Sequence, residues 1–377
     1  MGNKPRLAVL KKIKNKYTTK MINVTQPFLP PYDVYEKYIK QIWERKWLTN
    51  NGPLVQELEK KLKDYLGVKH LFYTNNGTIA IQIAIKAMEL KGEIITTPFS
   101  YVATTNSILW EGCTPVFADI NAIDFNIDPE KIVPLINKNT SAILATHVYG
   151  NPCNAAAIEK IAKEHHLKVI YDGAHAFGAT LNGRQVLSFG DVATCSFHAT
   201  KLFHTTEGGC IITNDDALAE KIMLYRQFGH IGDEYYSIGI NGKSSEMHAA
   251  MGLSNLPYVA AIIAKRKIIC EEYDKCLAGL KLLRPARLGG TEYNYAYYPV
   301  VFESEKLLIR VKEYLANCSV FTRRYFFPSL NTLPFANGDA CPVSEDIALR
   351  VLALPLYYDL SVSEVQTITD YLKKFLK

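Results

Sequence analysis

From Pro53 onward, the pattern of hydrophobic and polar positions predicts helices and strands in alternation. Pro53 suits the first position of a helix, Leu54, Leu58 and Leu62 keep one face apolar, and Gly67 favours its end. Short apolar runs then predict strands, and longer segments with apolar residues every three or four positions predict helices between them. The strands are expected at residues 70–74, 93–97, 115–119, 141–147, 169–171, 192–197 and 209–213, and the helices at 77–90, 101–110 and 155–165.

This alternation is typical of an α/β fold, in which a mostly parallel central sheet is covered by helices on both faces. The pattern changes near residue 255. A long helix is expected over 259–280, followed by strands at 297–302 and 320–325 and by a last helix over 363–376.

We therefore predict three parts. They are a basic tail over residues 1–20, a large domain over 21–255 and a smaller C-terminal α+β domain over 256–377. In parallel sheets, ligands bind in the loops at the carboxyl ends of the strands, so the chemistry is expected there.

The composition is that of an ordinary globular chain. Hydrophobic residues make up 48% and charged residues 21% of the 377 residues, which excludes a disordered protein. No run of about eighteen consecutive apolar residues occurs, so no membrane-spanning helix and no membrane partner are expected. The formal charge of +6 comes from residues 1–20, which hold seven cations and no acid, so that the rest of the chain carries −1. A neutral body of this kind predicts no nucleic-acid surface.

The basic leader has no single interpretation. It lacks the apolar core of a secretory signal, because Lys11 and Lys12 interrupt the run from Leu7 to Leu10. A disordered tail and an extension upstream of a natural start at Met21 are the favoured interpretations. A segment for targeting or for nucleic-acid contact is the less favoured one.

The eight cysteines predict a reducing compartment. They stand singly, without a C-x-x-C pair or a cluster with histidine, and suit small core positions. We therefore expect a cytoplasmic protein.

Several common motifs of cofactor and metal sites are absent from the sequence. There is no G-x-G-x-x-G, no G-x-S-x-G and no H-E-x-x-H, and the nine histidines are not spaced as metal ligands. Gly242-Lys243-Ser244 resembles the end of a phosphate loop, but Ser237 stands where that loop requires glycine. We therefore expect neither a dinucleotide nor a metal.

A different constellation follows the predicted strand ends. Asp172 and Lys201 come after two different strands, so both can face one ligand at the same edge of the sheet. Asn75-Asn76-Gly77-Thr78 opens a helix, whose free N–H groups and positive dipole end suit a phosphate. Tyr101, at another strand end, offers an aromatic face. A ligand with a phosphate, an aromatic ring, a ring nitrogen and an aldehyde would use all four features, and pyridoxal 5'-phosphate is such a ligand.

Each of these residues also has a simpler interpretation. A lone lysine is most often a solvated surface residue, and Asp172 taken alone is better explained as a helix cap. Gly77 and Thr78 suit a turn, Tyr101 suits a core, and His175 suits a hydrogen-bonded interior position. The convergence of four independent strand ends on the needs of one ligand favours the cofactor site.

Further motifs surround these residues. They are Trp47-Leu48-Thr49-Asn50-Asn51-Gly52-Pro53, Asn76-Gly77-Thr78, Thr96-Thr97-Pro98-Phe99-Ser100-Tyr101-Val102-Ala103-Thr104, His147-Val148-Tyr149-Gly150, Tyr171-Asp172-Gly173-Ala174-His175-Ala176, Ser196-Phe197-His198-Ala199-Thr200-Lys201 with Glu207-Gly208-Gly209, and Asn241-Gly242-Lys243-Ser244-Ser245-Glu246. Together they resemble the DegT/DnrJ/EryC1/StrS family of pyridoxal-phosphate-dependent sugar aminotransferases. The resemblance begins near Ile22 and implies the aspartate-aminotransferase fold (fold type I).

The resemblance implies a role for each matching residue. Lys201 would be the Schiff-base lysine, and Asp172 would hold the proton of the pyridine nitrogen. Asn241 would reach the phosphate of a neighbouring subunit, which implies a homodimer with a composite active site. The implied cofactor-binding residues are Gly77, Thr78, Tyr101, Asp172, His175, Ser196, Lys201 and Asn241.

The sequence also departs from the family pattern. Tyr171 replaces Glu, and His175 replaces Gln but can still meet the phenolic oxygen of the cofactor. Lys243 replaces the usual Arg. Tyr325 and Asn331 match a segment that the family uses for the sugar, with Asn331 in place of His, and both are candidate substrate contacts.

The implied reaction moves an amino group from L-glutamate to a keto group of a nucleotide-linked sugar. The similarity is closest to enzymes that convert dTDP-4-dehydro-6-deoxyglucose to dTDP-4-amino-4,6-dideoxyglucose for surface polysaccharides such as the lipopolysaccharide O-antigen. Amination at C3 of a similar sugar is the alternative. A dehydratase, in which histidine replaces the lysine, is disfavoured by Lys201, and a non-catalytic sensor is disfavoured by Lys201 and Asp172 together.

Overall fold

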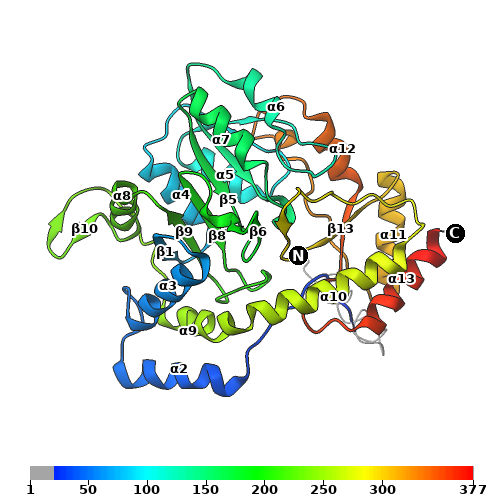
Figure 1. Ribbon diagram of the computed structural model, residues 1–377, viewed down its shortest axis with the longest axis horizontal. Helices are drawn as coiled ribbons and strands as arrows, with labels where there is room; N and C mark the ends of the chain where they lie inside the picture. The colour runs from blue at the N-terminus through cyan, green and yellow to red at the C-terminus, as the bar shows by residue number, and fades with distance from the viewer. Residues whose placement is uncertain (1–20, 377) are drawn as a thin grey trace, which may run out of the picture.

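A seven-stranded sheet forms the centre of the protein in this computed structural model, which describes residues 21–376 (Figure 1). The predicted basic tail over residues 1–20 lies outside the described residues. The strand order is β1-β9-β8-β5-β4-β2-β3, and β9 runs antiparallel to the others. This mostly parallel sheet confirms the predicted α/β class. The strands are β1 (His70–Thr74), β2 (Glu93–Thr96), β3 (Thr114–Phe117), β4 (Thr140–Thr146), β5 (Lys168–Asp172), β8 (Val192–Ser196) and β9 (Gly209–Thr213).

Helices cover both faces of the sheet because the strands are apolar on both sides. On β5, Val169 and Tyr171 pack into one hydrophobic cluster, whereas Ile170 packs into another on the opposite face. The first cluster includes residues of α3 (Pro53–Leu66), α7 (Ala155–Glu164) and α9 (Glu246–Asn255). The second includes residues of α4 (Gly77–Ala87), α5 (Val102–Trp110) and α8 (Asp216–Arg226).

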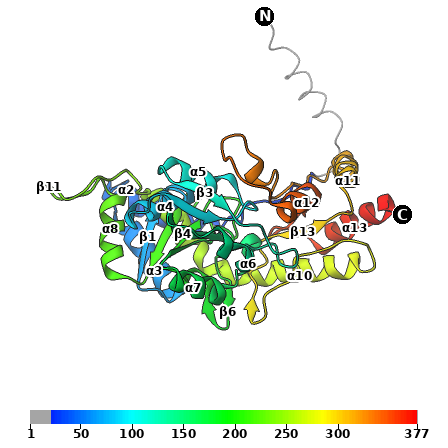
Figure 2. The ribbon, with the colours of Figure 1, turned by 90° about the horizontal axis from the view of Figure 1, so that it is seen from above.

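The C-terminal part has a hydrophobic core of its own. The elements of this part are α10 (Val259–Leu277), β13 (Tyr298–Val301), α11 (Glu305–Asn317), α12 (Pro342–Arg350), β14 (Val351–Leu354) and α13 (Val362–Leu376), and all except α12 contribute residues to that core. Figures 1 and 2 show α10 running from the sheet towards α11 and α13. Ile22 also packs into this core, so the first described residues lie against the C-terminal part of the chain. The exact domain limits at residue 255 stay a prediction.

The strand predicted over residues 320–325 is wrong. Only isolated bridges occur there, between Val320 and Ile22 and between Arg323 and Ala353. The apolar pattern suggested a strand, but Arg323, Tyr325 and Phe326 line a cavity instead of continuing a ladder.

The other predicted elements occur within a few residues of their expected ends, whereas several elements were not predicted. These are α2 (Tyr32–Arg45), α6 (Pro129–Ile132), α8, α9, α11, α12, β14 and the short strands β6 (Thr180–Leu181), β7 (Arg184–Gln185), β10 (His230–Ile231), β11 (Glu234–Tyr235) and β12 (Thr291–Glu292). The hairpin of β10 and β11 projects from the body beside α8 (Figures 1 and 2).

One helical stretch of the described residues, Glu246–Leu277, is long and apolar enough to cross a membrane by length and composition. It passes this test although no uninterrupted apolar run occurs in it. The stretch packs inside the fold, because α9 contacts α2 and α3, and α10 contacts α13. It also carries the buried charged residues Glu246 and Arg266. We therefore interpret it as a pair of core helices.

Candidate active site

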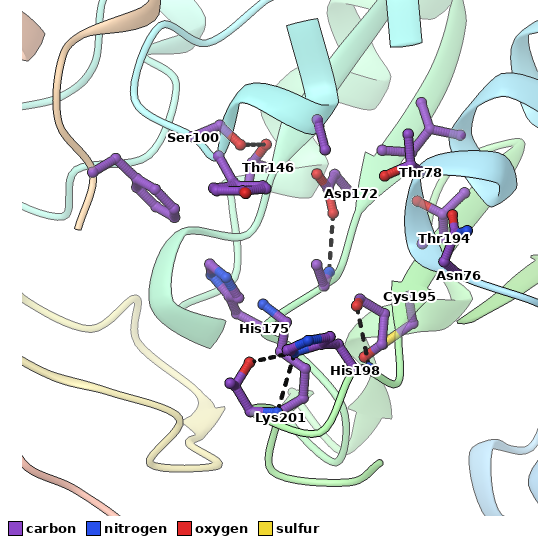
Figure 3. Close-up of a pocket in the computed structure, with 18 of the residues that line it drawn as sticks. Asn76, Thr78, Ser100, Thr146, Asp172, His175, Thr194, Cys195, His198 and Lys201 are labelled. Atoms are coloured by element: carbon purple, nitrogen blue, oxygen red, sulfur yellow. Dashed lines mark hydrogen bonds between the residues drawn. The ribbon is translucent and has the colours of Figure 1, made fainter. Parts of the chain in front are cut away.

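A cavity of about 260 Å³ lies where the carboxyl ends of the parallel strands meet. Residues that follow β1, β2, β5 and β8 line it, together with a segment from the C-terminal part of the chain. Figure 3 shows how several of them face a common space. The predicted site residues that line this cavity are Gly77, Thr78, Tyr101, Asp172, His175, Ser196, Lys201 and Tyr325.

The first turn of α4 forms the part of the cavity expected to hold a phosphate. The Asn76 side chain caps this helix by accepting a hydrogen bond of 2.9 Å from the backbone N–H of Ile79. The first N–H groups of a helix have no partner within it, and they favour an anion. Ser196, at the end of β8, lies beside this turn: a Cβ atom built on Gly77 would be 2.9 Å from the Ser196 Cβ.

Asp172 ends β5 with its carboxylate buried at the cavity. Its Oδ1 accepts a hydrogen bond of 3.0 Å from the backbone N–H of Ala174, and its Oδ2 accepts one of 2.7 Å from the Thr104 hydroxyl. The carboxylate therefore caps the turn after β5, and it also lines the cavity. No helix follows at residues 173–179, so the simpler interpretation of Asp172 as a helix cap is not confirmed. The two roles are compatible because each carboxylate oxygen can accept a further hydrogen bond.

Lys201 lies in the turn after β8, held by a hydrogen bond of 2.9 Å from its backbone N–H to the His198 carbonyl. Burial lowers the pKa of the Lys201 amine below its usual value, while Tyr325 and Asp172 act in the opposite direction. A lysine with a lowered pKa is more often neutral, and the neutral amine is the form that acts as nucleophile and base.

His175 lines the cavity and contains a buried polar atom without a partner in the described part of the chain. Its Nδ1 is buried and has no hydrogen-bond partner among the described residues. The ring is stacked on Phe326 with centroids 5.4 Å apart and meets the edge of Tyr297 at 4.8 Å. Burial, with a contribution from the charge of Lys201, holds the pKa of His175 well below its usual value, so the ring is neutral. An unpartnered nitrogen at such a position favours a ligand that supplies its hydrogen bond.

Aromatic rings and one arginine form another part of the cavity lining. Tyr101 precedes α5, and 53% of it is exposed, so its ring is free to cover a bound ring. The Arg323 guanidinium lies 4.5 Å from the ring centroid of Tyr325. No individual role was predicted for Arg323, although it stands two positions before the predicted Tyr325.

Two predicted residues do not line this cavity. Asn331 is buried in a loop, where its amide nitrogen donates to Glu345 at 2.7 Å and to the Asp339 carbonyl at 3.0 Å. Its oxygen accepts a hydrogen bond of 2.6 Å from Ser329. Because these bonds use both polar ends of the amide, the geometry does not support the predicted substrate contact of Asn331.

Asn241 is exposed in a second, polar cleft of about 240 Å³, which it shares with Thr49, Asn50 and Lys243. It therefore does not face the cofactor cavity of its own chain, as expected for a residue that would serve a neighbouring subunit.

Glu246 has a structural role that sequence reasoning missed. Its buried carboxylate accepts hydrogen bonds of 2.9 Å from the backbone N–H groups of Leu54 and Val55, at the start of α3. It thus caps a helix from about 190 positions away. Pro53 and the closely packed Gly52 mark that helix start in the sequence, but nothing local identifies the distant carboxylate.

These features fit pyridoxal phosphate. The narrow approach at Gly77 suits its phosphate, and the His175 side chain in the cavity lining suits its phenolic oxygen. The buried carboxylate of Asp172 suits its ring nitrogen, and the amine of Lys201, with its lowered pKa, suits its aldehyde. Within residues 21–376, no group of three or more His, Cys, Asp or Glu side chains is arranged to hold a metal ion.

Comparison with known proteins identifies the family. The model of the DegT/DnrJ/EryC1/StrS aminotransferase family matches residues 33–373. The chain belongs to this family. It is therefore a pyridoxal-phosphate-dependent sugar aminotransferase, as the resemblance implied.

Individual relatives are similar over almost their whole length. A dTDP-4-amino-4,6-dideoxy-D-glucose transaminase of Shigella dysenteriae is 42% identical over 365 residues, which cover 94% of this chain and 99% of the relative. A GDP-perosamine synthase of Vibrio cholerae is 30% identical, again over 94% of this chain and 99% of the relative. The crystal structure of DesI with its TDP-sugar product is 32% identical, with a TM-score of 0.90 over 94% of this chain and 93% of that one.

Proposed function

We propose that this aminotransferase acts on dTDP-4-dehydro-6-deoxyglucose and produces dTDP-4-amino-4,6-dideoxyglucose for a surface polysaccharide. The observation that carries the proposal is the 42% identity, over nearly the full length of both chains, to a transaminase named for that product. A second such relative, from Escherichia coli, has the same identity. The GDP-perosamine synthases are less similar, at 28–33% identity, which favours a dTDP-linked substrate.

The residues of the cavity divide the work of amino transfer. When bound, pyridoxal phosphate supplies the aldehyde that exchanges amines and a ring that accepts electrons. Lys201 binds the cofactor and, as a free neutral amine, removes a proton from the carbon that bears the amino group and returns it at a different carbon. Asp172 stabilises a proton on the ring nitrogen. Gly77, Thr78 and Ser196 hold the phosphate.

We further propose that L-glutamate donates the amino group and that the protein works in the cytoplasm. The isolated cysteines support this compartment. A homodimer with a composite active site is supported by Asn241, which lies outside its own cofactor cavity but within a polar cleft.

The proposal is tested by giving the purified holoenzyme dTDP-4-dehydro-6-deoxyglucose and L-glutamate, and by analysing the product with mass spectrometry and NMR. We expect an amino group at C4, no product from the Lys201→Ala variant, and slower turnover of the corresponding GDP-linked sugar. An amino group at C3 would favour the alternative 3-aminotransferase. A product that has lost water without gaining nitrogen would indicate a dehydratase, and cofactor absorbance unchanged by glutamate would indicate a non-catalytic sensor.

A further inference from the structure

A line of three buried hydroxyl groups ends at the Asp172 carboxylate. The Thr104 hydroxyl lies 2.7 Å from Asp172 Oδ2, the Ser100 hydroxyl lies 2.9 Å from that of Thr104, and the Thr146 hydroxyl lies 3.0 Å from that of Ser100. Figure 3 shows the contact between Ser100 and Thr146 at the cavity. Each of these four residues is less than 9% exposed. The line is therefore largely shielded from bulk water, although Ser100, Thr146 and Asp172 also line the cavity.

The carboxylate fixes the direction of every proton in this line. An ionised carboxylate can only accept hydrogen bonds, so Thr104 must give Asp172 its single hydroxyl proton. Thr104 can then only accept from Ser100. Ser100 has thereby used its own proton and must accept from Thr146. The three O–H dipoles consequently point the same way, with their positive ends towards Asp172.

Aligned hydrogen bonds strengthen one another and stabilise a negative charge at their end. A carboxylate stabilised in this way stays ionised and leaves the proton on a basic nitrogen beside it. The hydrogen bonds on both of its oxygens also fix the orientation of the carboxylate plane. We propose that Thr104, Ser100 and Thr146 are positioning residues, which orient the Asp172 carboxylate and keep its negative charge available to the ring nitrogen of the cofactor. This inference rests on the aminotransferase function, but it does not depend on which sugar is the substrate.

The neighbouring residue provides a matched control. Thr105 is on the same helix and equally buried, yet its hydroxyl has no hydrogen-bond partner among the described residues. Both Thr104→Val and Thr105→Val replace a buried hydroxyl by a methyl group of similar size. If the hydroxyls of this helix matter only for packing, the two variants should behave alike.

The first test compares holoenzymes of the wild type, Thr104→Val, Thr104→Ser and Thr105→Val. We expect Thr104→Val to weaken pyridoxal phosphate binding about tenfold and to lower kcat about tenfold, with KM changed less than twofold. The visible spectrum of its bound cofactor should move towards the form with an unprotonated ring nitrogen. Thr104→Ser should restore the cofactor affinity, kcat and the spectrum, and Thr105→Val should match the wild type.

Equal effects of Thr104→Val and Thr105→Val on cofactor affinity and spectrum, whatever their melting temperatures, would overturn the proposal. These two readouts use no sugar. A wrong sugar assignment would therefore leave them unchanged, whereas it would appear at once in the product analysis.

The second test asks whether the three hydroxyls act as one line. Ser100→Ala alone should weaken cofactor binding about threefold, because it removes the donor to Thr104 but leaves the bond to Asp172. In the Thr104→Val background the line is already cut, so adding Ser100→Ala should cause no further loss. Additive losses in this double-mutant cycle would mean that Ser100 acts independently of Thr104. They would overturn the proposal that the three hydroxyls act as one line.

Discussion

A Cβ atom on Gly77 would lie 2.9 Å from the Cβ of Ser196 and 3.2 Å from its Cα. The first turn of α4 and the end of β8 are therefore closer than a side chain at residue 77 allows. This approach brings helix N–H groups and a serine hydroxyl to one side of the cavity, although the two residues are far apart in sequence. The close packing of α4 against β8 therefore requires glycine, which has no side chain, at residue 77.

We expect Gly77→Ala to weaken cofactor binding by about tenfold, because Ser196 would have to shift by several tenths of an ångström. Gly289→Ala is the control, since no atom beyond its chain neighbours lies within 4 Å of the added Cβ. Titration of the apoenzymes with pyridoxal phosphate, followed by fluorescence, measures the difference. Equal affinities for both variants would show that the phosphate binds elsewhere.

Lys201→Ala and Lys201→Arg should both abolish amino transfer, because neither side chain can bind the cofactor covalently and then move the proton. Borohydride reduction of the wild-type holoenzyme, followed by peptide mapping, should find the cofactor on Lys201. Lys168 and Lys221 are natural comparisons. Both lie in surface ion pairs, with Asp191 and Glu89, and finding the label on either would refute the assignment.

Asp172→Asn separates the two roles of this carboxylate. An asparagine oxygen can still accept the hydrogen bond from the N–H of Ala174, so the turn and the melting temperature should change little. A neutral amide cannot stabilise a proton on the ring nitrogen, so kcat should fall by about two orders of magnitude or more. If turnover stays near that of the wild type, Asp172 serves only as a cap.

Glu246→Ala should destabilise the fold without touching the cavity. It leaves the N–H groups of Leu54 and Val55 without their acceptor, at a cost of about 1–3 kcal/mol in the free energy of unfolding. Denaturant unfolding measures the loss, with the exposed Glu220→Ala as control. An unchanged midpoint would mean that water replaces the carboxylate at this helix end.

Local sequence patterns predicted the sheet and most of the cavity for a physical reason. Apolar strands specify a buried parallel sheet, and the chain order puts Asp172, Ser196 and Lys201 at its carboxyl edge. The motifs that surround these residues are local, so their roles could be inferred before the fold was known.

Contacts between distant segments could not be predicted in this way. The bond between Thr104 and Asp172 and the cap of Glu246 on α3 join residues whose own neighbours give no sign of the partner. The segment at residues 323–326 has the apolar pattern of a strand, but it turns towards the cavity because of its long-range packing. Asn331 matched a motif, yet Ser329 and Glu345 occupy its amide.

Asn241 is predicted to complete the active site of a partner subunit. If Asn241 reaches the phosphate in a partner subunit, Asn241→Asp should inactivate the enzyme by putting a negative charge against that phosphate. In a mixture with Lys201→Ala, each mixed dimer would then have one site with both defects and one site with neither. Equal amounts mixed at random should recover about a quarter of the wild-type activity as subunits exchange.

A mixture of Lys201→Ala with Asp172→Asn is the control and should recover nothing. Lys201 and Asp172 both line the cavity of their own chain, so each site of a mixed dimer keeps one defect. If the Asn241→Asp mixture also stays inactive while native mass spectrometry detects mixed dimers, Asn241 serves its own subunit.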